Sequence, residues 1–511
     1  MKKPGDPIQI NGHQYTLGER IGGGTEGNVF RLVEKPGALA KLIDVNRKTE
    51  RQIADERKHL QKLVDICQSI TNTKELSVRT FAALPQALLD NELGYVMKEA
   101  ANREPISAYL NVPETDSGAW YVSHGLYKRY QIIHELFRAL QVIHLAGLVF
   151  TDLSPNNILT SPKANDIVFI DTDNLRTRDD PFLNVLGTPG YMAPELFSGI
   201  PSEASVLTDE EKAEIKQGIV TPESDIFSAA VIAFQLLVFN HPFIGDLVDN
   251  GSQEDEEAAY RGAFDYIFKP GTKNNRTGNV FVDRYERITT KEIRELFKRT
   301  FVDGKNVALS RPTDLEFIDA FERGLSLIVK CPYCGTENIY NLVLDKDEKC
   351  VADAKCFDPD CDKNIPTQQI LSVYAKGKEG PLEEVILGEV GIGPDEKQIP
   401  ISRKVLHHSD SWPDCIYLSD IGAGIGNRKD DLIGAIKISK DNPDFVVFRL
   451  LSNENVEIKA VVAPLDPHSE KIVPVAPNSE TSFAYKRHYV VLQGNSLKHG
   501  KFFVYFKVED I

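Results

Sequence analysis

Phe150-Thr151-Asp152-Leu153-Ser154-Pro155-Asn156-Asn157 is the stretch on which the fold assignment depends, and Val168-Phe169-Ile170-Asp171 follows it after a short loop. Together they place an Asp, an Asn five residues later, and a second Asp directly after a predicted strand. Phosphoryl transfer needs such a set, because one carboxylate orients and deprotonates a hydroxyl while a second carboxylate and an amide hold Mg²⁺ against phosphates. We expect Asp152 to be the base, and Asn157 and Asp171 to be the magnesium ligands. An ordinary turn between two strands is the alternative, since Asp, Pro and Asn are common turn residues.

Composition and charge exclude several classes of protein. The 511 residues allow about three domains, each able to bury a core. The net charge of −16 argues against a general nucleic-acid binder, because such binding rests on Lys and Arg that neutralise phosphates. The sequence contains no apolar run of the roughly 20 residues that cross a bilayer, and its first residues lack the apolar core of a secretory signal. We therefore expect a cytoplasmic protein without nucleic-acid or membrane partners.

A glycine-rich turn follows the first predicted strand. The turn contains Ile21, Gly22, Gly24, Gly27 and Val29. The three glycines fit the pattern G-x-G-x-x-G, which lets backbone N–H groups approach phosphate oxygens because no Cβ stands in the way. Dinucleotide-binding folds share this pattern but continue directly into a helix. Here the short, β-branched segment 29–33 follows instead, which favours a hairpin.

A lysine in the next apolar strand needs a partner, because an unpaired ammonium is costly among apolar residues. Lys41 is this residue, and residues 47–65 downstream carry many helix formers. Glu56 lies one turn before Leu60, at the edge of the predicted buried face of this helix, and we expect it to pair with Lys41. Glu50 is the second candidate. The alternatives are an edge-strand lysine that reaches solvent and a solvated helix glutamate.

Taken in order, these elements resemble a protein kinase domain. The further matching stretches are His144-Leu145-Ala146-Gly147, Gly187-Thr188-Pro189-Gly190-Tyr191-Met192-Ala193-Pro194-Glu195, Ser224-Asp225-Ile226-Phe227-Ser228 and Arg311-Pro312-Thr313. They extend over about residues 13–326, and the second stretch resembles the Ser/Thr version of the family. The resemblance implies an α+β, bilobal kinase domain over residues 1–326, with an N-lobe at about 11–97 and a C-lobe at about 103–326.

The resemblance also implies a role for each matching residue. The implied catalytic residues are Asp152, Lys41, Asn157, Asp171 and Glu56. The implied ATP-binding residues are Ile21, Gly22, Gly24, Gly27, Val29, Lys41, Met97 as gatekeeper, Glu99, Ala100, Asn157 and Asp171. Thr188 would position the hydroxyl, whereas Asp225 and the pair Glu195–Arg311 would be structural. The implied reaction is ATP- and Mg²⁺-dependent phosphorylation of Ser/Thr in protein substrates, autophosphorylation included.

Three departures from the family pattern bear on activity. Phe150-Thr151 replaces His-Arg, which removes the arginine that would pair with a phosphorylated activation loop. Ser154 replaces a lysine that contacts the transferred phosphate, and Asp171-Thr172-Asp173 replaces Asp-Phe-Gly, which adds a carboxylate near the metal. Because of these departures we expect a slow enzyme. Because Lys41, Asp152 and Asp171 are all present, we expect an active kinase rather than a pseudokinase. The alternatives are a nucleotide-binding pseudokinase scaffold in a stress-response or defence complex, and a small-molecule kinase; segment 187–195 favours a protein substrate over the latter.

Two insertions, 201–217 and 246–280, are longer than a minimal kinase needs. Both are polar. A docking element and a mobile loop are the two interpretations of the second insertion, and we favour the mobile loop.

Five of the seven cysteines fall between residues 331 and 361, which favours a metal over disulfides in a chain without a leader. The predicted zinc ligands are Cys331, Cys334, Cys356 and Cys361. The first two form a zinc knuckle by spacing, with Gly335 after them, and Cys350 is the spare candidate for the second pair. A strand over 339–344 predicts a small zinc ribbon at 327–370 with structural Zn²⁺. A redox dithiol and unligated cysteines are the alternatives.

From about residue 370, short alternating runs separated by Gly, Pro, Asn and Asp predict an all-β, sandwich-like accessory domain over 371–511. The order of kinase domain, zinc ribbon and β domain resembles bacterial kinases encoded beside a metal-dependent protein phosphatase and a von Willebrand A protein in tellurite-resistance or stress clusters. That resemblance implies these two proteins as partners. The β domain is faintly similar to a forkhead-associated sandwich but lacks its Gly-Arg and Ser-x-x-His signatures.

Overall fold

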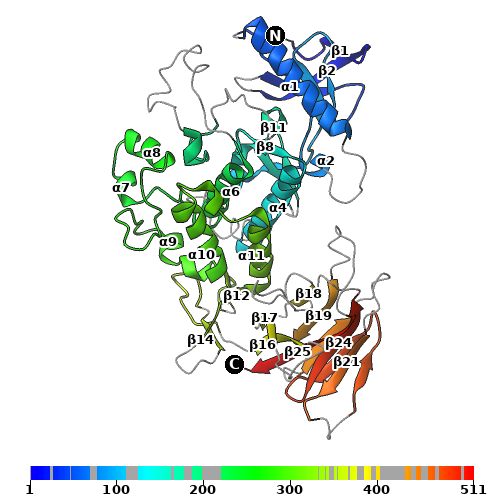
Figure 1. The fold of residues 1–511 in the computed structure, drawn as a ribbon, viewed down its shortest axis with the longest axis vertical. Helices are drawn as coiled ribbons and strands as arrows, with labels where there is room; N and C mark the ends of the chain where they lie inside the picture. Colours follow the sequence, from blue (N-terminus) through cyan, green and yellow to red (C-terminus); the bar gives the residue numbers. More distant parts are fainter. Residues whose placement is uncertain are drawn as a thin grey trace. The chain divides into compact units, whose positions relative to one another are not determined.

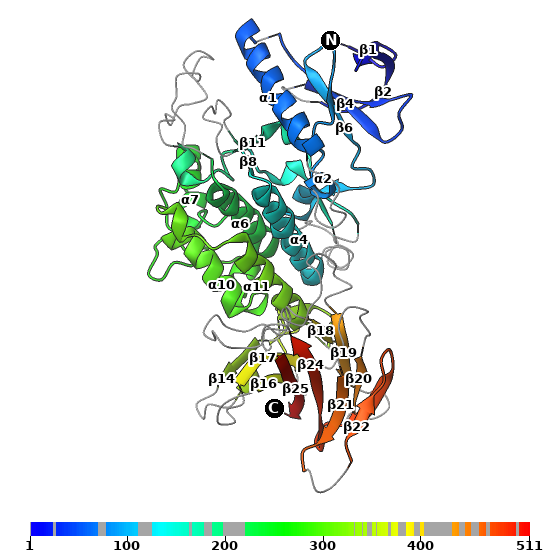
Figure 2. The same ribbon diagram turned by 45° about the vertical axis from the view of Figure 1, so that its right-hand side comes forward.

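Figures 1 and 2 show the chain as a computed structural model. The structure describes residues 2–23, 27–46, 48–69, 78–110, 125–162, 166–177, 187–197, 220–331, 333–339, 341–344, 350–353, 355–365, 369–376, 385–392, 399–402, 432–438, 445–450, 459–466, 471–496 and 500–510. The chain forms two compact units. The first comprises Met1–His124, Gln131–Asn279 and Glu295–Ile318, and the second comprises Gly125–Tyr130, Val280–Arg294 and Asp319–Ile511.

The first unit begins with a six-stranded antiparallel sheet in the order β1-β2-β3-β4-β6-β5. Its strands are β1 (Pro7–Ile10), β2 (His13–Gly23), β3 (Gly27–Leu32), β4 (Ala38–Ile43), β5 (Ala87–Leu88) and β6 (Gly94–Lys98). Side chains alternate between two faces: Ala38 and Ala40 of β4 join one buried cluster, whereas Leu39 and Ile43 join another. Lys41 shares the second face. The hairpin predicted after the glycines is confirmed by the pairing of β2 with β3.

Helix α1 (Glu50–Ser69) covers this second face, where Leu60 packs into the cluster that holds Leu39 (Figure 2). The helix begins at a reciprocal cap: the Gln52 N–H donates to Thr49 Oγ1, and the Thr49 N–H donates to the Gln52 side chain. The predicted helix over 47–65 is therefore confirmed in kind, with its end four residues later. Cys67 is buried on this helix.

The rest of the first unit is mainly helical, as expected for the second lobe. Its helices and strands, some of which continue into the second unit, are β7 (Glu104–Pro105), η1 (Ile106–Tyr109), α4 (Leu126–Leu145), β8 (Leu148–Phe150), η2 (Pro155–Asn157), β9 (Ile158–Thr160), β10 (Ile167–Phe169), η3 (Thr172–Asn174), β11 (Leu175–Thr177), η4 (Pro194–Phe197), α6 (Pro222–Val238), α7 (Asp246–Asp249), α8 (Gln253–Tyr260), α10 (Lys291–Lys298), η7 (Arg299–Asp303), η8 (Ala308–Ser310) and α11 (Asp314–Leu327). Almost every residue of α6 is buried, and Phe234 packs edge-on against Phe297 and Phe301. Among the described residues, no helix is long and apolar enough to cross a membrane.

The mobile loop predicted for residues 246–280 is wrong, because the structure forms α7 and α8 there. Ser252 and Asp255 cap α8 reciprocally, and the acidic run at 254–257 lies at the start of this helix, where its dipole favours negative charge. Asn274 then ties the segment to the body: its buried side-chain amide donates to the carbonyls of Phe243 and Asp265 at 2.9 Å each. The insertion at 201–217 lies outside the described residues.

The second unit contains α9 (Val280–Asp283), the turn η6 (Tyr285–Arg287), two hairpins and two antiparallel sheets. The hairpins are β12 (Ile328–Lys330) with β13 (Glu337–Ile339), and β14 (Asn341–Leu344) with β15 (Cys350–Asp353). One sheet has the order β17-β16-β25-β24-β21-β22 and the other β18-β19-β20-β23. Their strands are β16 (Gln369–Lys376), β17 (Val385–Ile392), β18 (Ile399–Ser402), β19 (Leu432–Ile438), β20 (Phe445–Leu450), β21 (Lys459–Pro464), β22 (Val473–Val475), β23 (Glu480–Ala484), β24 (His488–Ser496) and β25 (Gly500–Asp510). The sandwich and the domain boundaries stay predictions.

Candidate active site

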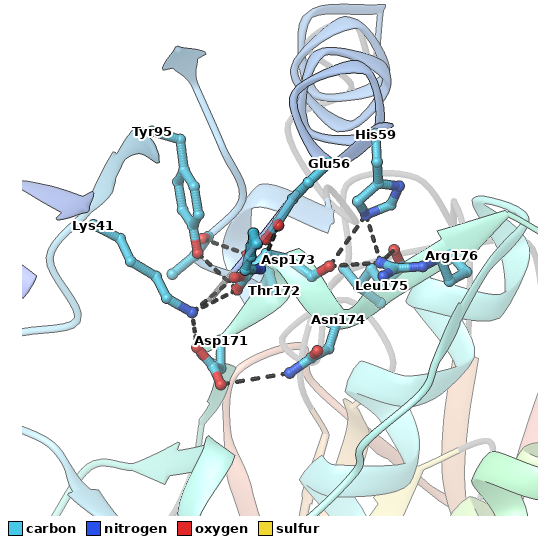
Figure 3. Close-up of polar contacts among 12 residues, drawn as sticks. Lys41, Glu56, His59, Tyr95, Asp171, Thr172, Asp173, Asn174, Leu175 and Arg176 are labelled. Atoms are coloured by element: carbon cyan, nitrogen blue, oxygen red, sulfur yellow. Dashed lines mark hydrogen bonds and ion pairs between the residues drawn. The ribbon is translucent and has the colours of Figure 1, made fainter. Parts of the chain in front are cut away.

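Lys41 lies in the middle of the sheet, between Val29 of β3 and Tyr95 of β6. It is 4% exposed. Its ammonium pairs with two carboxylates from the segment after β10: it donates to Asp171, and to both oxygens of Asp173 at 2.8 and 2.9 Å (Figure 3). Burial lowers the pKa of Lys41, but the charges of Asp173 and Asp171 outweigh burial and hold that pKa above its usual value. A buried cation is thus compensated, as the sequence required.

Glu56 does not make the predicted pair with Lys41. Its carboxylate forms an ion pair with Lys48, which lies just ahead of α1. Two facts explain the difference: Lys48 is close in sequence to the helix, and Asp173 already neutralises the Lys41 ammonium. Glu50, the second candidate, is exposed at the helix start.

Asp171 follows β10 in a left-handed backbone conformation, with φ of 58°. Asp tolerates this region better than most residues, and strained backbone of this kind occurs at functional sites. The Ile170 N–H donates to the Asn157 carbonyl at 2.9 Å, which joins the segments of the two predicted magnesium ligands. Burial and the charge of Asp173 raise the pKa of Asp171, Lys41 opposes them, and Asp152 raises it further. Lys41, Asp152 and Asp171 therefore lie close enough for their charges to interact, and the backbone of Asn157 adjoins the segment that carries Asp171.

Asp152 follows β8 and lies beside the hydroxyl of Thr188. One Asp152 oxygen accepts the Thr188 N–H at 2.8 Å and the Thr188 hydroxyl at 2.9 Å. The two segments approach so closely at Gly187 that a Cβ there would lie 2.8 Å from the Thr151 carbonyl oxygen. These hydrogen bonds place Thr188 beside Asp152, while its expected role in positioning the substrate hydroxyl stays a prediction.

The loop that carries Asp152 is braced from below by Asp225 of α6, which is 2% exposed. Its carboxylate accepts the Phe150 N–H at 2.9 Å and hydrogen-bonds His144 Nε2 at 3.1 Å, while His144 Nδ1 lies 3.0 Å from Asp314. Burial lowers the pKa of His144, but the hydrogen bonds to Asp225 and Asp314 outweigh it and raise that pKa to about 9. The bracing role expected for Asp225 is confirmed. The His144–Asp314 contact is a feature that sequence reasoning missed.

Arg311 and Glu195 form the expected pair. Two parallel hydrogen bonds of 2.7 Å join the guanidinium to the carboxylate, and Arg311 also donates to the carbonyls of Glu223 and Gly304. The Arg311 side chain is fully buried. The pair anchors the segment that follows Thr188, and therefore helps to hold Thr188 against Asp152.

The residues expected to contact ATP lie on β2, β3, β6 and the segment after β6. Ile21 is 40% exposed, and Gly22 pairs with Val29; Gly24 lies outside the described residues. Gly27 is required by packing, because a Cβ there would lie 2.2 Å from the Leu42 carbonyl oxygen. Packing alone therefore explains why residue 27 is a glycine, whether or not a phosphate binds there.

Met97 is buried beside Leu39, in the cluster that α1 covers. Glu99 follows β6: its N–H donates to the Gly37 carbonyl at 2.8 Å, and its carboxylate binds Arg31 at 2.7 Å. Ala100 is half-buried next to it. The adenine contacts expected of Glu99 and Ala100 stay predictions.

The comparisons with known proteins agree with this geometry. A family model described as the protein kinase domain matches residues 15–300, more than half of the chain. The serine/threonine-protein kinase pkn3 of Myxococcus xanthus is 25% identical over 46% of this chain and 39% of its own length. PknA of Mycobacterium tuberculosis is 28% identical over 31% of each protein, and the mouse serine/threonine-protein kinase 33 is 23% identical over 59% of this chain and 57% of its own length. The chain thus spans less than two thirds of these relatives.

A second candidate site, in the second unit, is a cluster of four cysteines. The sulfurs of Cys331, Cys334, Cys356 and Cys361 all lie within 4.8 Å of one another, with 3.7 Å between Cys331 and Cys361 and 3.5 Å between Cys334 and Cys356. Four thiolates about 2.3 Å from a tetrahedral zinc would stand about 3.8 Å apart, so the cluster fits this ion. These are the four predicted ligands. Cys350 instead begins β15, where it pairs with Leu344.

The second cysteine loop is anchored by two arginines that sequence reasoning missed. Arg284 and Arg287 donate to Asp362 at 2.8 and 2.6 Å, and Arg287 also donates to the Cys356 carbonyl at 2.7 Å. Lys355 bonds the other Asp362 oxygen. These cations hold the pKa of Asp362 below its usual range. The two arginines precede the cysteines by some seventy residues, and no local pattern links them.

Proposed function

Because the chain belongs to the protein kinase family, we propose that it binds Mg²⁺-ATP and transfers the γ-phosphoryl group to Ser or Thr hydroxyls of protein substrates. One observation carries the proposal. Lys41, Asp152 and Asp171 come from three separate segments, and they lie around one point together with the backbone of Asn157. Separate turns between strands would not require this convergence.

The proposed roles follow from the chemistry of the side chains. Asp152 accepts the proton of the substrate hydroxyl, the oxygen bonds to the γ-phosphorus, the bond to the β–γ bridging oxygen breaks, and ADP leaves. Lys41 binds the phosphates. Asn157 and Asp171 would hold Mg²⁺, which would supply positive charge against the charge that develops on the phosphates. Thr188, hydrogen-bonded to Asp152, keeps the base oriented toward the incoming hydroxyl.

The local charge supports a divalent cation at this point. Lys41 supplies one positive charge, whereas Asp171 and Asp173 supply two negative ones, and Asp152 adds a third nearby. Crowded carboxylates of this kind favour an oxygen-liganded ion such as Mg²⁺.

Phosphate incorporation from labelled Mg²⁺-ATP tests the proposal. We expect the wild type to label itself or a general protein substrate, and we expect Asp152→Ala and Asp171→Ala to abolish labelling. Asp249→Ala, a carboxylate paired with Arg276 away from this cluster, is the matched control and should label normally. Equal labelling in all four proteins would remove Asp152 and Asp171 from the mechanism. Nucleotide binding without labelling by the wild type would favour the pseudokinase scaffold.

We also propose that the four-cysteine cluster holds a structural zinc ion in a ribbon at 327–370. The four cysteine thiolates would fill all four positions of a tetrahedron, so no open position would remain for catalysis. Metal analysis should find about one zinc per chain, as a four-thiolate site predicts. The double change Cys331→Ser with Cys334→Ser should remove it, whereas Cys67→Ser, on α1, should not. Retention of zinc by the double variant would contradict the assignment.

The partners implied by the gene-cluster resemblance, a metal-dependent phosphatase and a von Willebrand A protein, stay proposals, as does a cytoplasmic setting. Co-purification of the three proteins from one cell extract would test the partnership.

A further inference from the structure

We propose that Asp173, rather than a glutamate of α1, is the positioning residue of Lys41. The inference rests on the proposed phosphoryl transfer, in which Lys41 binds the phosphates. Its basis is the bidentate contact of the Lys41 ammonium with both oxygens of Asp173, at 2.8 and 2.9 Å. Glu56, the α1 residue expected to pair with Lys41, pairs with Lys48 instead.

Asp173 is held in place independently of Lys41. The hydroxyl of Tyr95, fully buried on the neighbouring strand, donates to Asp173 Oδ1 at 3.0 Å. The Asp173 carbonyl accepts from Arg176 at 2.6 Å and lies 3.1 Å from His59 Nε2 (Figure 3). One residue earlier, the buried Thr172 hydroxyl donates to the Ala83 carbonyl at 2.8 Å. The carboxylate is therefore presented by a rigid turn, which a positioning residue requires.

The two carboxylates that contact Lys41 have different proposed roles. Asp171 is the proposed metal ligand, so its carboxylate is needed by the cation once Mg²⁺-ATP binds. Asp173 then remains as the anion that neutralises and directs the Lys41 ammonium. A glycine at position 173, as in the family pattern, has no side chain to do this. In such a protein the lysine depends on the helix glutamate.

The arrangement has a regulatory consequence. Where the lysine pairs with a helix glutamate, a shift of that helix breaks the pair and switches the enzyme off. Here Lys41 and its partner lie on the sheet and on the turn after β10, and neither belongs to α1. The position of α1 therefore does not gate the phosphate-binding lysine of this chain.

The pairing is tested first by stability, without any catalytic readout. Lys41→Met leaves two half-buried carboxylates, Asp171 and Asp173, uncompensated, so we expect a lower melting temperature. Adding Asp173→Asn should restore part of the loss, whereas adding Glu56→Gln should not. The matched control is the pair Lys48→Met with Glu56→Gln, which should couple to each other. Additive effects of Lys41→Met and Asp173→Asn would overturn the inference.

Kinetics tests the positioning role. At saturating Mg²⁺, Asp173→Asn should lower kcat by about 10- to 100-fold, with a smaller change in KM for ATP. This fold-change corresponds to the free energy that hydrogen bonds to a charged group usually contribute. Its melting temperature should stay near that of the wild type, because Asp171 still pairs with Lys41. Glu56→Gln should cost less than Asp173→Asn.

An equal or larger loss in Glu56→Gln would overturn the inference, as would a purely thermal effect of Asp173→Asn. If the wild type transfers no phosphate, the proposed function fails, while the stability cycle still decides whether Asp173 is the partner of Lys41.

Discussion

Raising the pH through about 9 should weaken the brace beneath the catalytic loop. His144 lies between Asp225 of α6 and Asp314 of α11, with both ring nitrogens hydrogen-bonded to carboxylates, so its protonated form is the one that the fold stabilises. Its pKa is raised to about 9 in the folded protein, against about 6.5 in an unfolded chain. A raised pKa contributes stability that is fully present below the unfolded value and is lost as the pH passes the folded value.

The size of the effect follows from the difference between the two pKa values. A shift of about 2.5 units corresponds to about 3 kcal/mol, a large part of the 5–15 kcal/mol that stabilises a typical domain. His144 is only 7% exposed, so little of this value is lost to solvent screening. The loss should develop between about pH 6.5 and 9. Burial raises the pKa of Asp225, and its hydrogen bond to His144 opposes this effect.

Chemical denaturation at a series of pH values from 6 to 10 measures this effect. The difference in unfolding free energy between the wild type and His144→Gln should be largest at pH 6 and should shrink by about 3 kcal/mol by pH 10. Titrations of groups that do not contact His144 are common to both proteins and cancel. His13→Gln, a change at an exposed histidine, is the control and should show a constant difference. Parallel curves for the wild type and His144→Gln would refute the reasoning.

Three further predictions follow from single contacts. Arg311→Met should lower stability by about 3 kcal/mol in chemical denaturation, because it leaves Glu195 without its buried partner, whereas Arg276→Met at a more exposed pair should cost under about 1 kcal/mol. Gly27→Ala should lower the melting temperature, because its Cβ would meet a carbonyl oxygen at 2.2 Å; Gly22→Ala, which has open space, should not. Asp362→Asn should speed the loss of zinc to a chelator, measured by metal release, since it removes the ion pairs that anchor the second cysteine loop; an unchanged release rate would contradict this.

The sequence predicted those parts of the site that depend on spacing along the chain. Asp152 and Asp171 each follow a short apolar strand, β8 and β10. Because the strand backbone is fixed by its pairing, the positions of the residues just after it are fixed as well. The cysteine pairs are similar, because Cys331-x-x-Cys334 forms one knuckle locally. Cys356 and Cys361, chosen over Cys350 because the sequence between them favours a turn, do lie in the cysteine cluster, while their role as zinc ligands stays a prediction.

The partner of Lys41 could not be predicted in the same way. Glu56 and Asp173 are both carboxylates at plausible distances along the chain, and the choice between them depends on how the turn after β10 meets the sheet. That meeting is a tertiary contact with no local signal. The error at residues 246–280 could have been avoided from the sequence. Ser252 and Asp255 form a capping box that marks the start of α8, but the acidic run after Ser252 was interpreted as a loop.

The contacts of Arg284 and Arg287 decide where a shortened protein that contains the kinase domain should end. A chain cut at residue 326, the predicted border, would keep Arg284, Arg287 and the Phe281 ring but discard Asp362 and Phe357, against which they pack. The cut would leave two charges and an aromatic surface facing water. Shortened proteins should therefore retain the cysteine loops through residue 365, because Asp362 and Phe357 of the second loop pair with Arg284 and Arg287 and pack on Phe281.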